Sequence, residues 1–269
     1  AVVYVVSGVC QPLLLTSCKI AGLADPRAQL YMLFYYAGPS LLLLTLIPRY
    51  NKLVPCTGPS FLAVVKGAVV ALFDLTAQSL NYTGASLAGA TIFALVYSSV
   101  AVWTAIFSRV FLGRTLNALQ MVGIALVFGG LCITAIDSTT LGDNVALGTL
   151  LVLFGSCMHG GTYVMSEGIM KGEADRLRFD ENAAIQAAVA FTGFLLWNLA
   201  YTVPRFDSLV QQPMGEAGTT IAQALTILSA FSLANFLHSI SFFHTLAHYP
   251  GGSTSAGVMK GLQAVLVFV

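Results

Sequence analysis

Residues 75–108 read LTAQSLNYTGASLAGATIFALVYSSVAVWTAIFS and contain no Asp, Glu, Lys or Arg. A helix that crosses a membrane needs about 20 apolar residues, so this run is too long for one span. The turn-forming sequence Asn81-Tyr82-Thr83-Gly84 divides it. We therefore expect one membrane helix to end near residue 80 and the next to begin near residue 86.

The rest of the chain has the same character. Further charge-free runs cover 1–18, 28–48, 115–136, 144–166, 182–204 and 217–259. The last run is divided at Tyr249-Pro250-Gly251-Gly252, because Pro lacks an N–H donor and Gly ends helices. We predict an all-α polytopic membrane protein with helices near 2–20, 28–47, 60–80, 86–112, 117–136, 145–169, 183–203, 218–247 and 253–269. Both ends of the chain lie in apolar runs, so we expect a tenth helix after residue 269.

The composition excludes several classes of protein. Hydrophobic residues make up 57% of the chain and charged residues 9%, whereas a soluble domain has roughly 25% charged residues. The net charge of +1 gives no basic surface for nucleic acid. The five cysteines show no C-x-x-C spacing, and no nucleophile elbow or H-E-x-x-H motif is present. We expect no metal, no cofactor and no enzymatic activity.

Loop charges predict the orientation of the chain. Lys and Arg concentrate in cytoplasmic loops. The loops and helix edges on the side of the N-terminus carry more of them, namely Arg49, Lys52, Lys66, Arg109, Arg114, Lys171, Arg176 and Arg178, than the opposite side, which carries Lys19, Arg27 and Arg205. This asymmetry predicts a cytoplasmic N-terminus.

The chain also contains a weak internal repeat. Residues 82–86 (YTGAS) align with residues 249–253 (YPGGS), and each segment follows a predicted helix by a short break. The alignment divides the chain into a first five-helix half, 1–137, and a second half, 145–269, which lacks its last helix. Because five is odd, the second half would be inverted in the membrane, as in many secondary transporters.

One stretch resembles a known family. The residues Phe111-Leu112-Gly113-Arg114, Gln120-Met121-Val122-Gly123 and Gly129-Gly130 resemble the fourth-to-fifth-helix signature of the drug/metabolite transporter superfamily, which includes EamA-type and nucleotide-sugar transporters. The resemblance implies a ten-helix inverted-repeat (5+5) fold with both termini in the cytoplasm. The family commonly has Glu at the position of Arg114.

Two ionisable residues lie deep in predicted helices, where a charge is costly and therefore a functional candidate. Lys260 shares a helix face with Gln263, and Asp74 shares one with Gln78. The resemblance to the nucleotide-sugar and sugar-phosphate branch implies that Lys260 contacts a phosphate. A structural ion pair between Lys260 and Asp74 is the alternative, as is snorkelling of Lys260 to the interface.

Four further side chains are candidates for contact with the substrate: Tyr97, Tyr163, Asn235 and His238. Each has a structural alternative, because Tyr, Asn and His also pack between helices. His244 and His248 have a spacing that can bind a metal, but a pair alone does not complete a site.

We therefore expect a secondary transporter that moves a small anionic or phosphate-bearing metabolite, such as a nucleotide sugar or sugar phosphate, by alternating access. Proton-coupled export of drugs or amino acids, with Asp74 as proton carrier, and a non-transporting membrane scaffold remain alternatives. The expected partners are a small-molecule substrate, the lipid bilayer and, as an open alternative, a second copy in a homodimer. Whether the membrane is that of the Golgi or ER or the plasma membrane stays open.

Overall fold

The described part of the chain is helical. The structure, a computed structural model, describes residues 1–44, 46, 59–115, 118, 121–126, 129–130, 133, 143–172 and 176–266. Among them, six helices are long and apolar enough to cross a membrane: Val2–Ile20, Phe61–Ala88, Thr91–Leu112, Asn144–Lys171, Phe179–Arg205 and Ile221–His248. A shorter apolar helix covers Leu30–Leu44. The expectation of an all-helical polytopic membrane fold is confirmed.

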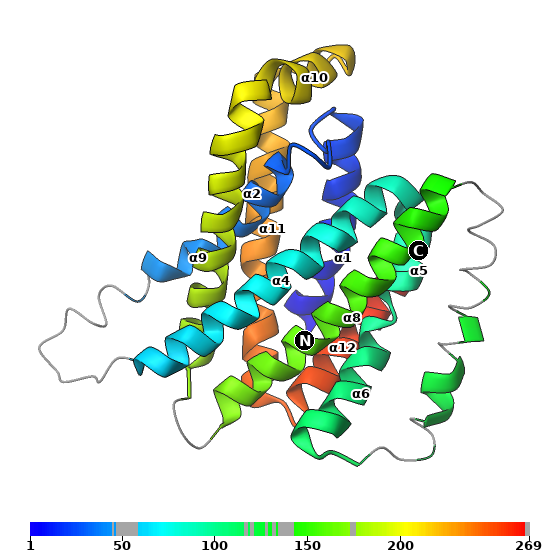
Figure 1. The fold of residues 1–269 in the computed structure, drawn as a ribbon, viewed down its shortest axis with the longest axis vertical. Helices are drawn as coiled ribbons and strands as arrows, with labels where there is room; N and C mark the ends of the chain where they lie inside the picture. Colours follow the sequence, from blue (N-terminus) through cyan, green and yellow to red (C-terminus); the bar gives the residue numbers. More distant parts are fainter. Residues whose placement is uncertain are drawn as a thin grey trace, which may run out of the picture. The chain divides into compact units, whose positions relative to one another are not determined.

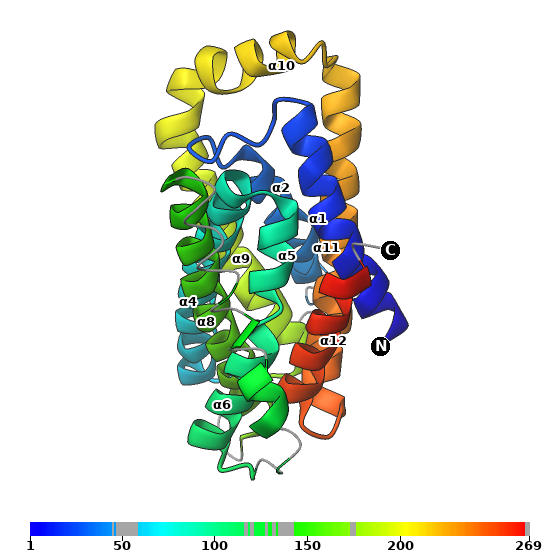
Figure 2. The same ribbon diagram turned by 90° about the vertical axis from the view of Figure 1, so that its right-hand side faces the viewer.

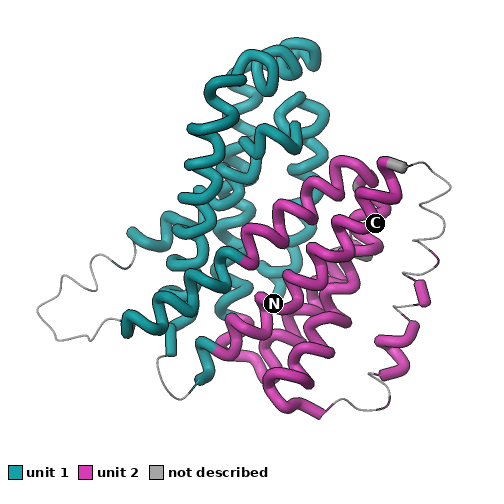
Figure 3. Tube along the Cα trace, in the orientation of Figure 1, with its two compact units in different colours: residues 1–72, 169–244 teal, residues 73–168, 245–269 magenta. Residues whose placement is uncertain are grey.

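The chain divides into two compact units, which are coloured separately in Figure 3. Unit 1 comprises residues 1–72 and 169–244, and unit 2 comprises residues 73–168 and 245–269. Each unit therefore contains segments from both predicted repeat halves. The repeat itself, with its boundaries at 1–137 and 145–269, stays a prediction.

Unit 1 is built from α1 (Val2–Ile20), α2 (Leu30–Ser40), the start of α4 (Phe61–Ala88), α9 (Phe179–Trp197) and most of α11 (Ile221–His248). The helices α2 and α9 pack side by side (Figure 1). Gly38 of α2 has no side chain, so α2 can approach the backbone of Ser232 on α11 closely. Close packing of this kind is typical of helices that associate through small residues in a membrane.

Residues 198–216 are helical, although the expected helix ends near residue 203. They form η1 (Asn198–Thr202), η2 (Val203–Arg205), η3 (Asp207–Gln211) and α10 (Gln212–Glu216). Figure 2 shows this segment crossing one end of unit 1 between α9 and α11. Two of its turns are π-helical, a form that appears as short bulges in otherwise regular helices.

Unit 2 contains the rest of α4, then α5 (Ala90–Tyr97), α6 (Val100–Leu112), most of α8 (Asp143–Lys171) and α12 (Gly252–Leu266). The helices α6 and α12 lie against each other (Figure 2). A Cβ at Gly257 of α12 would lie 3.1 Å from the Cα of Ala101, and one at Gly160 of α8 would lie 2.7 Å from the Cβ of Trp103. Glycine thus lets both α8 and α12 approach α6 closely.

The expected break at Asn81-Tyr82-Thr83-Gly84 is wrong. The helix α4 continues through these residues to Ala88, and Gly89 ends it with a φ of 85°. A Cβ at Gly84 would lie 2.6 Å from the carbonyl oxygen of Gly148 on α8. The glycine therefore serves helix packing here, while the left-handed backbone that L side chains rarely adopt occurs at Gly89.

Two other boundaries differ from expectation. Of the segment predicted as one helix over 86–112, residues 86–88 belong to α4, and the candidate span Thr91–Leu112 has a turn at Ser98-Ser99 between α5 and α6. Half of the expected helix over 117–136 lies outside the described residues, and residues 121–126 are helical. At the C-terminal end, α12 begins at Gly252, as the Pro-Gly-Gly sequence predicts.

Candidate functional site

The charged centre of unit 2 is a pair between α4 and α8. The Nδ1 atom of His159 lies 3.0 Å from Oδ1 of Asp74, and the two side chains are 8% and 18% exposed. Asp74 is one of the predicted site residues, and His159, which contacts it, is not. The pairing follows from the close crossing of these helices, where the backbone of Gly155 on α8 contacts Asn81 on α4.

Two tyrosines surround the imidazole of His159. The ring of Tyr163, one turn further along α8, meets it edge-on with centroids 4.8 Å apart. The ring of Tyr97, at the end of α5, lies 5.9 Å away. Edge-to-face and tilted ring pairs of this kind are favourable and fix the orientation of the imidazole. The predicted residues Tyr97 and Tyr163 are thus both at the charged centre.

Lys260 reaches the same cluster from α12. Its side chain is buried, and its Nζ lies 5.6 Å from the centroid of the Tyr97 ring. This distance is within the range of a cation–π interaction. The field of the Asp74 carboxylate also acts on the Lys260 ammonium. Gln263, one turn further along α12, is buried as well. An ammonium in a membrane interior therefore has an aromatic face and a carboxylate near it.

Polar side chains extend from the pair along both helices. On α4, Gln78 and Asn81 continue the face of Asp74, and on α8 Ser156 precedes His159 by one turn. All three are buried. The side-chain amide of Asn81 and the hydroxyl of Ser156 have no hydrogen-bond partner among the described residues. Buried polar groups are normally paired with protein or water, so these two have unused hydrogen-bonding capacity.

A second charged contact in unit 2 ties three helices together. Arg114, which follows α6, donates to both carboxylate oxygens of Glu167 on α8 at 3.0 and 2.6 Å. The same carboxylate accepts the N–H groups of Gly252 and Ser253 at 3.0 and 2.9 Å. Glu167 therefore closes the N-terminal end of α12 with a negative charge, which the helix dipole favours.

The prediction missed Glu167. Its position directly after the charge-free run 144–166 suggested a helix end, yet its side chain is only 1% exposed. The signal that was present in the sequence is Arg114, because an Arg and a Glu at the ends of adjacent helices can form charge-assisted hydrogen bonds. The carboxylate that the resemblance implies at residue 114 is thus absent, and a carboxylate instead faces that position from α8.

The other two predicted residues, Asn235 and His238, lie on α11 within unit 1. Asn235 accepts a hydrogen bond from Gln11 at 2.6 Å and donates to the carbonyl oxygen of Tyr35 at 2.6 Å. His238 contacts the hydroxyl of Ser7 at 3.2 Å, and its ring stacks on Tyr4. These contacts join α11 to α1 and α2. The structure places both residues in a different unit from the Asp74–His159 pair.

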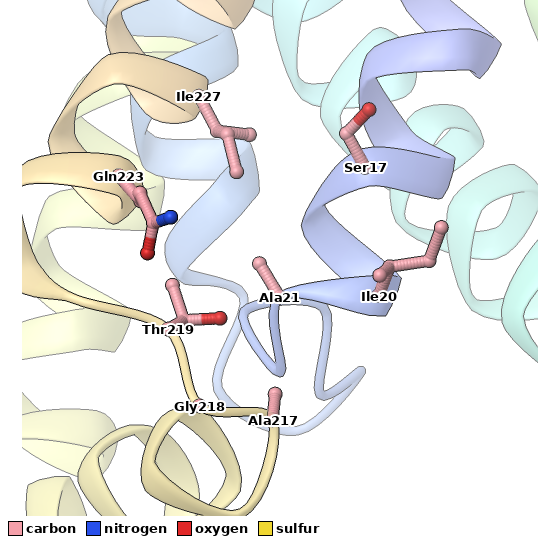
Figure 4. A pocket seen from close by; sticks show the side chains of 8 residues that line it. All are labelled: Ser17, Ile20, Ala21, Ala217, Gly218, Thr219, Gln223 and Ile227. Carbon is pink, nitrogen blue, oxygen red and sulfur yellow. The ribbon is translucent and has the colours of Figure 1, made fainter.

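Unit 1 also has an open hollow of about 300 Å³ near the end of α1 (Figure 4). Ile20, Ala21 and Ile227 give it apolar walls, and Thr219 and Gln223 contribute neutral polar groups. The side-chain oxygen of Gln223 already accepts hydrogen bonds from Thr220. None of the predicted site residues lines this hollow, and its lining carries no charge.

No group of three metal-ligating side chains occurs in the part of the chain that the structure describes. His244 packs edge-on against Phe179. Cys10, Cys18 and Cys157 are free thiols, while Cys56 and Cys132 lie outside the described residues.

The comparison with known families agrees with this architecture. No curated protein matches the chain. Residues 4–136 match the model of the EamA-like transporter family, and this region contains the motif residues 111–114, 120–123 and 129–130. The match and the apolar helices support a general transport role. The protein is therefore a multi-pass membrane protein whose residues 4–136 are similar to the EamA-like transporter family, which is consistent with the drug/metabolite transporter superfamily.

Proposed function

We propose that this protein is a secondary transporter that binds a small anionic metabolite at Lys260 and moves it by alternating access. The observation that carries the proposal is the burial of Lys260, which is 5% exposed. A cation inside a membrane protein is costly unless it is paired or has a function. An anion in this low-dielectric surrounding would interact with the ammonium more strongly than in water.

The neighbours of Lys260 suit a solute that is anionic at one end and polar elsewhere. Tyr97 offers an aromatic face, and Gln263 and Gln78 offer amide groups that can donate and accept. Phe93 stacks on Tyr97 with ring centroids 5.0 Å apart, which extends the aromatic surface. A phosphate-bearing metabolite such as a sugar phosphate or nucleotide sugar matches these groups, and the charge distribution of the loops favours a cytoplasmic N-terminus for the carrier.

A ligand screen tests the proposal. Purified full-length protein is heated with nucleotide sugars, sugar phosphates, amino acids and drug-like cations, because a ligand that binds the folded state raises the melting temperature by mass action. We expect a shift with phosphate-bearing compounds that disappears in Lys260→Met. The matched control is Lys66→Met, which changes an exposed lysine on α4 and should retain the shift.

Reconstituted vesicles then separate transport from binding. Uptake of the compound that shifts the melting temperature should fall at least about tenfold in Lys260→Met, since loss of one charge-assisted contact costs roughly 1.5–3 kcal/mol. A response to cations alone would replace the anion proposal by the export of drugs. Binding without uptake would favour a non-transporting membrane protein.

A further inference from the structure

We propose that the Asp74–His159 pair is a proton site that loads together with the anion at Lys260, so that the protein co-transports one proton with its solute. This inference rests on the proposed function, and it adds the coupling ion. It assigns a role to His159, which contacts Asp74 across the crossing of α4 and α8.

The geometry gives Asp74 two alternative cations. Its Oδ1 lies 3.0 Å from Nδ1 of His159, and the buried ammonium of Lys260 reaches the same cluster at the ring of Tyr97, 5.6 Å from its centroid. With a neutral imidazole, the carboxylate and the ammonium balance each other. An anion that binds Lys260 takes over this ammonium, which then no longer balances the negative charge of Asp74. An uncompensated charge in a membrane interior is costly.

A proton on His159 restores the balance. The imidazolium then pairs with Asp74, while Lys260 pairs with the anion, and the three side chains together carry one positive charge that offsets one negative charge of the solute. Histidine suits this role because its proton exchanges near neutral pH. Binding of the anion and of the proton therefore favour each other, and by thermodynamic linkage the coupling is reciprocal.

The remaining groups around His159 do not replace this proton. Tyr97 of α5 and Tyr163 of α8 face the imidazole with their rings. Where α8 meets α6, the neighbours of Gly160 are Trp103 and Thr104, and neither is charged. In the part of the chain that the structure describes, the charged groups of this cluster are Asp74 from α4 and Lys260 from α12.

Asn81 and Ser156 provide the start of a proton path. Asn81 follows Asp74 by seven residues, or about 10 Å along a helix, and Ser156 precedes His159 by one turn. Since Gly155 contacts Asn81, both groups lie on the same side of the pair, toward the end of α4. Their unpartnered side chains can hold water molecules, which bridge buried polar groups and carry protons between them.

Calorimetry in buffers of different ionisation enthalpy counts the protons taken up on binding. The probes are inorganic phosphate, glucose 6-phosphate and UMP, added to the full-length protein at a pH where each probe keeps its own protonation state. We expect uptake of about one proton per bound anion in the wild type. His159→Gln, whose neutral amide takes up no proton at this pH, should bind the anion with no proton uptake.

The matched control is His248→Gln, which changes an exposed histidine at the end of α11 and should still take up one proton. If His159→Gln does not fold, Asp74→Asn gives the same test, because removal of the carboxylate removes the need for a compensating proton. Anion binding without proton uptake in the wild type, or an unchanged proton count in a folded His159→Gln protein, would overturn the inference and leave the proposed function standing.

Vesicles add a test of direction. With the membrane voltage held at zero, a pH gradient of one unit, acidic outside, should accumulate the bound probe about tenfold in wild-type vesicles and not in His159→Gln vesicles. Uptake that proceeds only by exchange and ignores the gradient would overturn co-transport. If none of the probes binds at all, the anion site fails and the co-transport inference fails with it.

Discussion

The two compact units bury polar groups in different ways. In unit 1, Gln11, Asn235 and Tyr35 form a network of neutral groups that bond to one another at 2.6–3.2 Å. In unit 2, the buried groups carry charge, as in the Asp74–His159 contact and the Arg114–Glu167 pair. Buried polar atoms without a partner among the described residues occur in both units, for example at Asn81 and Ser156 in unit 2 and at Gln29 and Asn182 in unit 1.

This difference indicates which buried polar groups serve helix packing and which are candidates for function. A neutral network whose members satisfy one another specifies how α1, α2 and α11 pack and needs no ligand. A buried charge is more costly, and its retention in an apolar chain favours a role in binding or movement. The proposed site therefore lies in unit 2, and the contacts of Asn235 and His238 in unit 1 favour a structural role.

The largest effect on stability is expected at Glu167. Glu167→Ala leaves Arg114 without its carboxylate and exposes the N–H groups of Gly252 and Ser253. Breaking a buried ion pair by removing one partner costs about 3–5 kcal/mol. Because Arg114 is 29% exposed, we expect about 3 kcal/mol in an equilibrium unfolding titration in detergent.

The paired variant Arg114→Met/Glu167→Met shows whether charge compensation is the cause. It should be more stable than Glu167→Ala, since neither charge then remains alone. If Glu167→Ala lowers the free energy of unfolding by less than about 1 kcal/mol, the comparison between the two units fails. The buried charge of Glu167 would then contribute no more to stability than a neutral hydrogen bond in unit 1.

A smaller effect is expected in the neutral network of unit 1. Asn235→Leu removes the acceptor of Gln11 and the donor to the carbonyl oxygen of Tyr35. Leaving buried polar groups unpaired costs about 1–3 kcal/mol. We expect a loss of this size in the same titration, with the affinity for the anionic probe unchanged within about threefold. A complete loss of anion binding in a folded Asn235→Leu protein would restore Asn235 to the substrate site.

The sequence predicts the helices well wherever apolar runs are bounded by charge. The helix α1 begins at Val2 and ends at Ile20, as expected, and α12 begins after Pro250-Gly251. The break in the long run 75–108 was misplaced because Asn81-Tyr82-Thr83-Gly84 has the composition of a turn. Tertiary packing of Gly84 against Gly148 overrides that local signal. A rule that considers only residues close in sequence cannot predict this contact, because Gly148 lies on another helix.

The site was predicted in part for the same reason. The scarcity of charge singled out Lys260 and Asp74, and the structure brings them together with Tyr97 and Tyr163 in unit 2. Glu167 was missed because a carboxylate at the end of an apolar run is usually exposed. Its burial depends on Arg114, 53 positions earlier in the chain, and such a separation is visible only once the helices are assembled.

The smallest effect is expected at an ion pair of unit 1 whose arginine is 67% exposed. Asp25, in the loop between α1 and α2, accepts hydrogen bonds from the backbone and side chain of Arg27 at 2.7–3.2 Å. Partial burial alone would raise the pKa of this carboxyl, but the hydrogen bonds and charge of Arg27 outweigh it and hold the pKa below its ordinary value.

A lowered pKa means that Asp25 stabilises the fold at neutral pH and that this contribution is lost as the pH falls below the ordinary carboxyl range. Asp25→Asn should therefore lower the free energy of unfolding by less than about 1 kcal/mol at pH 7, since exposed pairs are screened by water, and the difference from wild type should shrink as the pH is lowered toward 3. Thermal unfolding of the wild type and of Asp25→Asn between pH 7 and pH 3 measures this difference. The control is Asp207→Asn, which replaces an exposed carboxylate on η3. If Asp25→Asn lowers the free energy of unfolding as much as Glu167→Ala does, burial of charge does not explain the difference in stability effects between the two units.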